Sequence, residues 1–284
     1  MAPFLKKPKV IISTDLNSES FYPGEPVNTR IFISSQDKTK VRAGTVNLIC
    51  TEVYWKLVSD GKHTRNQKTK GDLYRIEEEF LTPTELFPGT EISVQKSIIL
   101  PADSPPTISG RVVNLSWQLD VKLDIPKTRD IHEKRAIIVR PITMATPVTE
   151  DGEFARSNRI TKSNDEGDLA LILDSDYGIA GKTLSGRFEV MPKQDISVDG
   201  VRVELEMNES AGTKSSKTVV DMVQLENEIT FFPGAQRQWL FSLNIPDSAP
   251  PSFFMGNSSV EWRVKGILDK RRWKDFSVEY PIRL

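Results

Sequence analysis

The chain has 284 residues, with 38 lysines and arginines against 39 aspartates and glutamates and a formal net charge of -1. This balance creates no overall field that would attract a polyanion, so no nucleic-acid partner is expected. The hydrophobic content of 38% is typical of a folded globular protein. No apolar run is long enough to span a bilayer.

The amino-terminal segment is basic, with Lys6 and Lys7 placed before the first expected strand. It lacks the apolar stretch of a signal peptide, because polar residues at 13–15 interrupt it. The single cysteine, Cys50, has no partner for an internal disulfide and is expected to be a small buried apolar residue. Together these features favour a cytoplasmic location.

Alternation of apolar and polar residues predicts β-strands along the chain, and no segment has a sustained helical period. A Pro-Gly turn at 22–25 follows the first expected strand, and a polar loop is expected over Asp60–Gly71. A second Pro-Gly turn at 87–89 precedes an apolar strand, and residues 113–123 alternate around Trp117. The sequence therefore predicts an all-β fold.

The second half of the chain repeats the first. Phe87-Pro88-Gly89 matches 232–234, and Trp117 matches Trp262, each 145 residues later. Gly24 matches Gly181 at a separation of 157, so the first copy has 12 more residues in its middle, which we place within Asp60–Arg75. Two domains are therefore expected, 1–148 and 168–284, joined by a polar linker at 149–167.

The order of these motifs resembles the arrestin domain. Pro23-Gly24-Glu25 stands where that family opens the domain with a turn, and the Pro-Gly, Leu-Pro and Pro-Pro motifs of 88–106 and the Trp-bearing strand at 117–124 also fit. The resemblance covers residues 10–141 and 168–284 and is closest to α-arrestins, their prokaryotic sporulation-control relatives and the retromer small-subunit branch. It implies two tandem antiparallel β-sandwiches of the immunoglobulin-like type.

The same resemblance implies a non-enzymatic adaptor or scaffold without a cofactor. The expected partners are other proteins, among them cytoplasmic segments of membrane-protein cargo, phosphopeptides and trafficking or signalling proteins. Peripheral contact with a membrane and formation of a homo-oligomer stay open. One alternative is a self-associating regulatory protein of the sporulation-control type, and another is a carbohydrate-binding or hydrolytic β-sandwich.

Two basic segments are candidate partner-binding sites. The segment 60–71 contains four cations and lies where arrestins have a loop that probes receptors; these residues are Lys62, Arg65, Lys68 and Lys70. Arginine and lysine there would bind an acidic or phosphate-bearing partner, while the alternative is a solvated hairpin tip. Lys6 and Lys7 lie where some arrestins sense phosphate, and the alternative is a basic terminus left in water.

No catalytic or metal-binding motif is found in the sequence. The two histidines are 69 residues apart and have no zinc-ligand spacing with Cys50. Trp117 and Trp262 occupy the apolar positions of alternating strands, so they are expected in the core. Exposed aromatic residues in a groove, or two facing carboxylates, would favour the carbohydrate-binding alternative.

Overall fold

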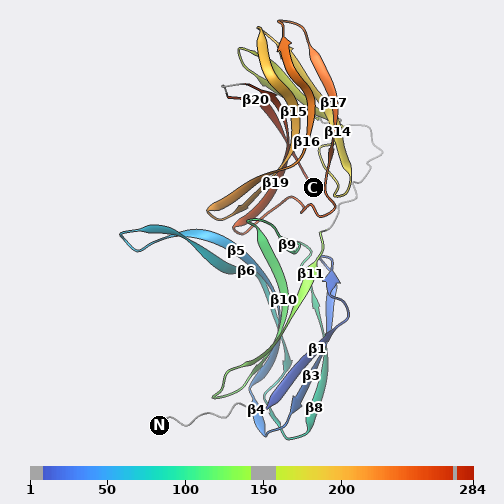
Figure 1. The fold of residues 1–284 in the computed structure, drawn as a ribbon. Helices are drawn as coiled ribbons and strands as arrows, with labels where there is room; N and C mark the ends of the chain where they lie inside the picture. The colour runs from blue at the N-terminus through green and yellow to red at the C-terminus, as the bar shows by residue number, and fades with distance from the viewer. Residues whose placement is uncertain (1–8, 142–157, 271–273) are drawn as a thin grey trace. The chain divides into compact units, whose positions relative to one another are not determined.

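The computed structural model describes residues 9–141, 158–270 and 274–284, and within these ranges the chain forms strands and turns without any helix. Two compact units divide the chain, Met1–Ile142 and Thr143–Leu284 (Figure 1). Each unit is a pair of packed β-sheets, which confirms the predicted all-β sandwich fold. No segment of the described ranges is a helix with the length and apolarity needed to cross a membrane.

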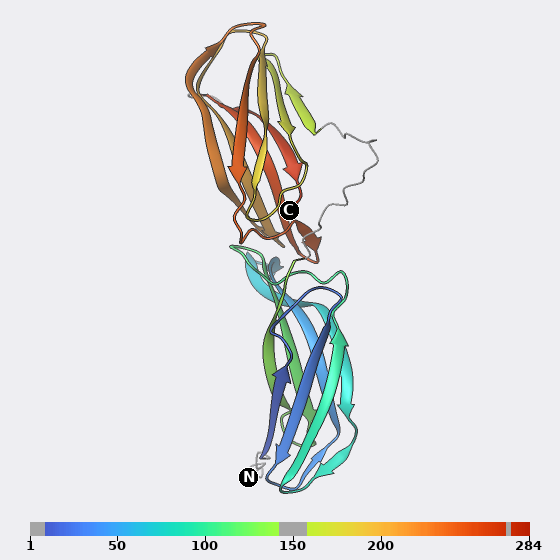
Figure 2. The same ribbon diagram turned by 90° about the vertical axis from the view of Figure 1, so that its right-hand side faces the viewer.

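The first unit has a small sheet and a large sheet that face each other (Figure 2). The small sheet has the strand order β1 (Val10–Leu16), β3 (Pro26–Ser35) and β8 (Thr90–Ile99). The large sheet has the order β2 (Ser20–Phe21), β11 (Ile131–Val139), β10 (Asn114–Asp124), β5 (Ala43–Ser59) and β6 (Thr64–Leu81), and β9 (Ile108–Ser109) also pairs with β10. A separate ladder joins β4 (Thr39–Val41) to β7 (Thr84–Leu86).

The core of the first unit lies between these sheets and is built largely from alternate residues of the strands. Trp117 on β10 is only 1% exposed and stacks on Tyr74, with ring centroids 5.8 Å apart. Its Nε1–H donates to the carbonyl oxygen of Pro105 at 2.8 Å. Because indole has this one donor, the bond allows the whole ring to be buried without an unsatisfied polar group.

The second unit also has two sheets. One has the order β12 (Arg159–Ser163), β13 (Gly167–Leu173), β14 (Thr183–Pro192) and β17 (Arg237–Asn244). The other begins with β16 (Lys214–Phe231), β15 (Ile196–Ala211) and β19 (Ser258–Asp269). Two strands, β18 (Phe253–Met255) and β20 (Phe276–Ile282), follow one another along the remaining edge of β19.

The two units share a strand register that matches the spacing of the sequence repeat. Trp262 is 2% exposed, and its Nε1–H donates to the carbonyl oxygen of Pro250 at 3.0 Å, as Trp117 does to Pro105. In the ladders, Trp117 lies opposite Cys50 and Trp262 lies opposite Met207. Cys50 and Met207 are 157 positions apart, and the two tryptophans are 145 positions apart. These are the two separations of the sequence repeat, so the structure pairs equivalent residues in the two units.

The Pro-Gly turns also have the backbone that the sequence predicts. Gly89 and Gly234 have φ values of +82° and +77°, which side chains with a Cβ rarely adopt. In each turn the residue after glycine donates its N–H to the phenylalanine carbonyl, Thr90 to Phe87 at 3.0 Å and Ala235 to Phe232 at 3.1 Å. Glycine is therefore required by the turn geometry at both positions.

Strand β12 lies inside the segment 149–167 for which the sequence predicts a linker. It pairs with β13 over its whole length, from Arg159↔Ile172 to Ser163↔Asp168. Its side chains are exposed except for the half-buried Ile160. An edge strand of this kind has no alternation for a sequence pattern to detect. The domain limits given above stay a prediction.

Candidate functional site

The strands β5 and β6 form a long hairpin whose outer part leaves the body of the first unit (Figure 1). Strand β10 accompanies β5 only as far as Val53, which lies opposite Asn114. Beyond that residue β5 pairs with β6 alone, up to Ser59↔Thr64. The loop predicted over Asp60–Gly71 is therefore corrected: only residues 60–63 form the turn, and the rest is strand.

This hairpin is longer than the equivalent hairpin of the second unit, which is formed by β15 and β16. There, Ala211 pairs with Lys214 and the chain turns at 212–213. The equivalent pair in the first unit is Tyr54↔Thr69, and the ladder continues past it for five more pairs. We call residues Trp55–Lys68 the hairpin extension; the five additional pairs make it about 17 Å long.

The hairpin extension contains the 12 additional residues of the first unit, because fourteen residues stand where the second unit has two. The sequence places them within Asp60–Arg75, and the structure corrects that position to Trp55–Lys68. An insertion in a hairpin lengthens both strands equally if pairing is kept. A comparison of motif spacings in the sequence gives only the total number of inserted residues. It cannot show that half of them precede the turn.

The turn of the extension is built around Asp60. The Oδ1 atom of Asp60 accepts hydrogen bonds from the backbone N–H groups of Lys62 at 3.0 Å and His63 at 2.8 Å. These bonds, that of His63 first, lower the pKa of the Asp60 carboxyl. Gly61 has a φ of +88°, as such a turn requires. The turn therefore holds its shape with Asp60 ionised.

The four cations predicted from the sequence lie at the turn and on β6, and all are exposed. Lys62 is in the turn, while Lys68 lies opposite Trp55 and Lys70 opposite Val53. Arg65 lies opposite Val58, and since neighbouring strand positions alternate, it points to the other face of the hairpin. The structure thus brings Lys68 and Lys70 together on one face and separates them from Arg65.

A fifth cation, Lys56 on β5, was not among the predicted residues. It is exposed and lies opposite Gln67. Together with the four predicted residues it gives five cations along the hairpin from Trp55 to Lys70, against one carboxylate, Asp60. Within the described ranges none of the five forms an ion pair; they are Lys56, Lys62, Arg65, Lys68 and Lys70.

Apolar side chains accompany the cations on one face of the extension. The Lys68 Nζ lies 5.6 Å from the centroid of the Trp55 ring, within cation–π range. Leu57, two residues further along the same face, is 62% exposed. The sequence prediction missed both residues because it began at Asp60, after the apolar part of β5. The extension therefore offers positive charge and exposed hydrocarbon side by side.

Two other predicted basic residues, Lys6 and Lys7, lie outside the residues that the structure describes. Their suggested phosphate-sensing role stays a prediction. Cys50, which was expected to be a small buried apolar residue, has 0% exposure, and this confirms the expectation. Burial, followed by the charges of Glu52 and Asp72, raises the pKa of its thiol to about 12. The thiol therefore stays protonated and is a poor nucleophile.

Metal binding and acid–base catalysis find no support in the described ranges. No group of three or more His, Cys, Asp or Glu side chains there is arranged to hold a metal ion. Glu261 and Glu279 in the second unit are two neighbouring carboxylates, but Arg263 bridges them, at 3.5 Å and 2.8 Å. Burial opposes ionisation of Glu279, yet Arg263 and Lys265 bond to it and keep its pKa below the ordinary value. A hydrolytic pair needs one carboxyl whose pKa is raised, so this arrangement does not suit the hydrolytic alternative.

Comparison with known proteins gives one family. The model of the family described as "Arrestin (or S-antigen), C-terminal domain" matches residues 6–147, which is half of the chain. Nothing among curated proteins matches the chain at a significant level. The matched residues include the entire β5–β6 hairpin and all six basic residues predicted from the sequence.

Proposed function

The chain belongs to the arrestin family, and from this premise we propose that it is a non-enzymatic adaptor whose hairpin extension binds acidic or phosphorylated segments of other proteins. Members of this family generally act by binding proteins and not by catalysis. The observation that carries the proposal is the set of five exposed cations on the hairpin, none of which has an ion-pair partner in the described ranges.

The charge of the hairpin differs from that of the rest of the chain. The chain as a whole is nearly neutral, and charged groups elsewhere form ion pairs, as Arg202 does with Glu204 and Asp269 and as Lys217 does with Glu206. Five cations within one hairpin create a local positive potential, which speeds association with a negatively charged segment. The potential extends for about 8 Å at physiological ionic strength, so it acts on a partner close to the hairpin.

The chemistry of the side chains fits carboxylates and phosphates. Arg65 has a planar guanidinium that binds two oxygens of a phosphate at once, whereas the lysines act as point charges. Trp55 and Leu57 lie next to Lys68 and would bury apolar atoms of the same partner. Cytoplasmic segments of membrane proteins that acquire phosphate groups have this combination of charge and hydrocarbon.

The test uses a fluorescein-labelled peptide in which phosphoserine alternates with glutamate, and its counterpart with plain serine. Four substitutions to glutamine remove the predicted cations, Lys62, Arg65, Lys68 and Lys70. If each exposed ionic contact contributes about 0.5 kcal/mol, the loss is about 2 kcal/mol, or roughly a 30-fold rise in Kd for the phosphopeptide. The effect should shrink as salt is added.

A matched control removes the same amount of charge elsewhere. Four exposed cations of the second unit that form no ion pair within the described residues, three lysines and one arginine, are replaced by glutamine; they are Lys162, Lys182, Lys274 and Arg237. The control chain should bind the phosphopeptide as the unchanged chain does. Equal weakening by both sets would indicate a general charge effect, and unchanged binding after removal of the hairpin cations would refute the proposal.

A further inference from the structure

The strand β20 has an edge on which no described strand pairs. On its other side β20 pairs with β19, from Leu268↔Phe276 to Trp262↔Ile282. Just past its end, the N–H and carbonyl of Arg283 point away from β19 and bond to the carbonyl of Asp176 and the N–H of Gly178. In an antiparallel strand, successive residues direct their backbone N–H and carbonyl groups to opposite edges of the strand. Ser277, Glu279 and Pro281 therefore direct their backbone groups to the same outer edge as Arg283.

Pro281 fits this assignment, since proline has no N–H to donate and is tolerated where the N–H position faces away from the sheet. The open part of the edge therefore offers the N–H and carbonyl groups of Ser277 and Glu279 and the carbonyl of Pro281. Unpaired backbone groups in such a row are a template for one more strand.

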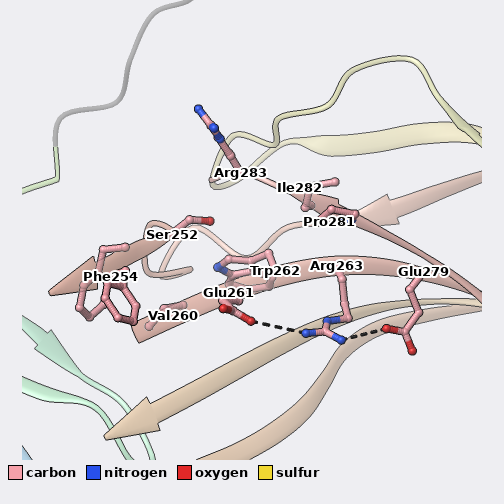
Figure 3. A pocket seen from close by; sticks show the side chains of 11 residues that line it. Ser252, Phe254, Val260, Glu261, Trp262, Arg263, Glu279, Pro281, Ile282 and Arg283 are labelled. Atoms are coloured by element: carbon pink, nitrogen blue, oxygen red, sulfur yellow. Dashed lines mark hydrogen bonds and ion pairs between the residues drawn. The ribbon is translucent and has the colours of Figure 1, made fainter. Parts of the chain in front are cut away.

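Two hollows flank this edge, one on each face of β20. The larger, of about 820 Å³, lies on the face of Glu279 and Pro281 and also borders Phe254 (Figure 3). The smaller, of about 510 Å³, borders Tyr280 and Ile160. Pro281, Ile282 and Arg283 line both hollows. Because side chains of a strand alternate between faces, a strand added here would place successive side chains in the two hollows in turn.

The lining of the larger hollow indicates which side chains would fit. Phe254 is 84% exposed and provides an apolar wall. Arg263 is already engaged by Glu261 and Glu279 (Figure 3). Arg283 is exposed, points away from that cluster, and has no ion-pair partner within the described ranges. The hollow therefore favours a carboxylate at Arg283 next to apolar side chains.

The first unit serves as an internal reference for these residues. The tryptophan with its carbonyl partner is common to both units, at Trp117 and Trp262. The residues that shape the larger hollow differ between the units. The strand pairing shows that Ser109 of the first unit is equivalent to Phe254, and that Ile138 is equivalent to Arg283. The fold does not require Phe254 or Arg283, so their presence in the second unit needs another reason.

We propose that the outer edge of β20 binds an extended, acidic and apolar segment of a partner protein as an added strand, with a carboxylate at Arg283 and apolar side chains in the two hollows. This surface lies in the second unit and does not depend on the hairpin extension. An adaptor with both surfaces would have a separate binding site in each unit.

The first experiment selects peptides from a displayed library of random dodecapeptides, with the full chain as target. Selected peptides should contain an acidic residue next to successive apolar residues, one for each hollow. Their affinity should fall at least about 10-fold for a chain with Phe254→Ser and Arg283→Ile, the residues that the first unit has at these places. A control chain with Arg237→Ile and Leu240→Ser loses an exposed arginine and a leucine that is 81% exposed on the same unit, and it should bind normally.

The second experiment tests the added strand through the peptide alone. One selected peptide is synthesised with N-methyl groups on every second residue, in either of the two phases. The phase whose N–H groups face β20 should lose about 10-fold or more in affinity, and the other phase about 2-fold or less. Equal loss in both phases, no enriched peptide, or full binding to the Phe254→Ser, Arg283→Ile chain would overturn the proposal. A chain without the hairpin extension should bind the selected peptide normally, so the two proposals fail separately.

Discussion

Replacement of the hairpin extension by the turn of the second unit would separate its role in binding from any role in stability. In this variant, the dipeptide Gly-Thr, taken from positions 212–213, replaces Trp55–Lys68, so that Tyr54 and Thr69 flank a two-residue turn. The second unit shows that the same strand pair closes with this two-residue turn, since Ala211 and Lys214 flank it. We expect the variant to fold and to lose the binding of acidic peptides.

The expected change in the free energy of unfolding is small. Most side chains of the extension are exposed, and the half-buried Trp55 and Val58 account for about 1–2 kcal/mol of lost burial. In the variant, the separation between the paired residues Gly44 and Leu81 falls from 37 to 25 positions. This equals the separation of Val201 and Glu226, the equivalent pair of the second unit. Shorter loop closure returns about 0.3 kcal/mol. The net loss should therefore be about 1 kcal/mol.

Urea denaturation followed by circular dichroism measures this change, and fluorescence anisotropy with the phosphoserine peptide measures binding. A loss of more than about 3 kcal/mol would mean that the extension is part of the sandwich and not an appendage, against the exposure of its side chains. Retained peptide binding, with the fold intact, would show that the cations of the extension are not the binding site.

Three further predictions follow from the core, the thiol and the ion pairs. Trp117→Phe leaves the buried Pro105 carbonyl without its donor and should lower the free energy of unfolding, measured in urea, by about 1–3 kcal/mol. Trp262→Phe should lower it less, because the Pro250 acceptor is only half-buried. Equal losses would count against the hydrogen bond as the cause. Cys50, with a pKa of about 12, should resist iodoacetamide at pH 8 in the folded chain and react once urea unfolds it. The lowered pKa of Glu279 stabilises the fold above the ordinary carboxyl pKa, and this contribution disappears as pH falls through the folded-state value. Glu279→Gln should therefore lower stability at pH 7 and reduce its fall between pH 5 and 3, and an unchanged pH profile of stability would contradict this.

The sequence allowed the fold class to be predicted because two signals agreed along the chain. Alternation around Trp117 and Trp262 reports burial of one strand face, and the Pro-Gly turns at 87–89 and 232–234 require a backbone that few other residues adopt. Both signals are local, so they survive without knowledge of tertiary contacts. The repeat spacing then indicated the equivalence of the two units.

The candidate sites were harder to predict because alternation reports a buried strand face, and neither the exposed end of a hairpin nor the open edge of a strand is such a face. Thr64–Lys68 is exposed on both faces, so it lacks alternation, and its polar sequence predicts a loop. Trp55 and Leu57 had the alternation of β5 but belong to its part outside the core. The edge of β20 depends on where backbone groups point, and its larger hollow brings together residues from three strands. No spacing in the sequence reports either property.

The symmetrical growth of the β5–β6 hairpin has a consequence for how such chains diversify. Residues added in pairs at its turn change how far the tip reaches, while Cys50, Trp117 and the rest of the interior keep their neighbours. The length of the hairpin and the stability of the unit can therefore change independently in this architecture. Related chains could differ widely in the span of this appendage and still melt at similar temperatures.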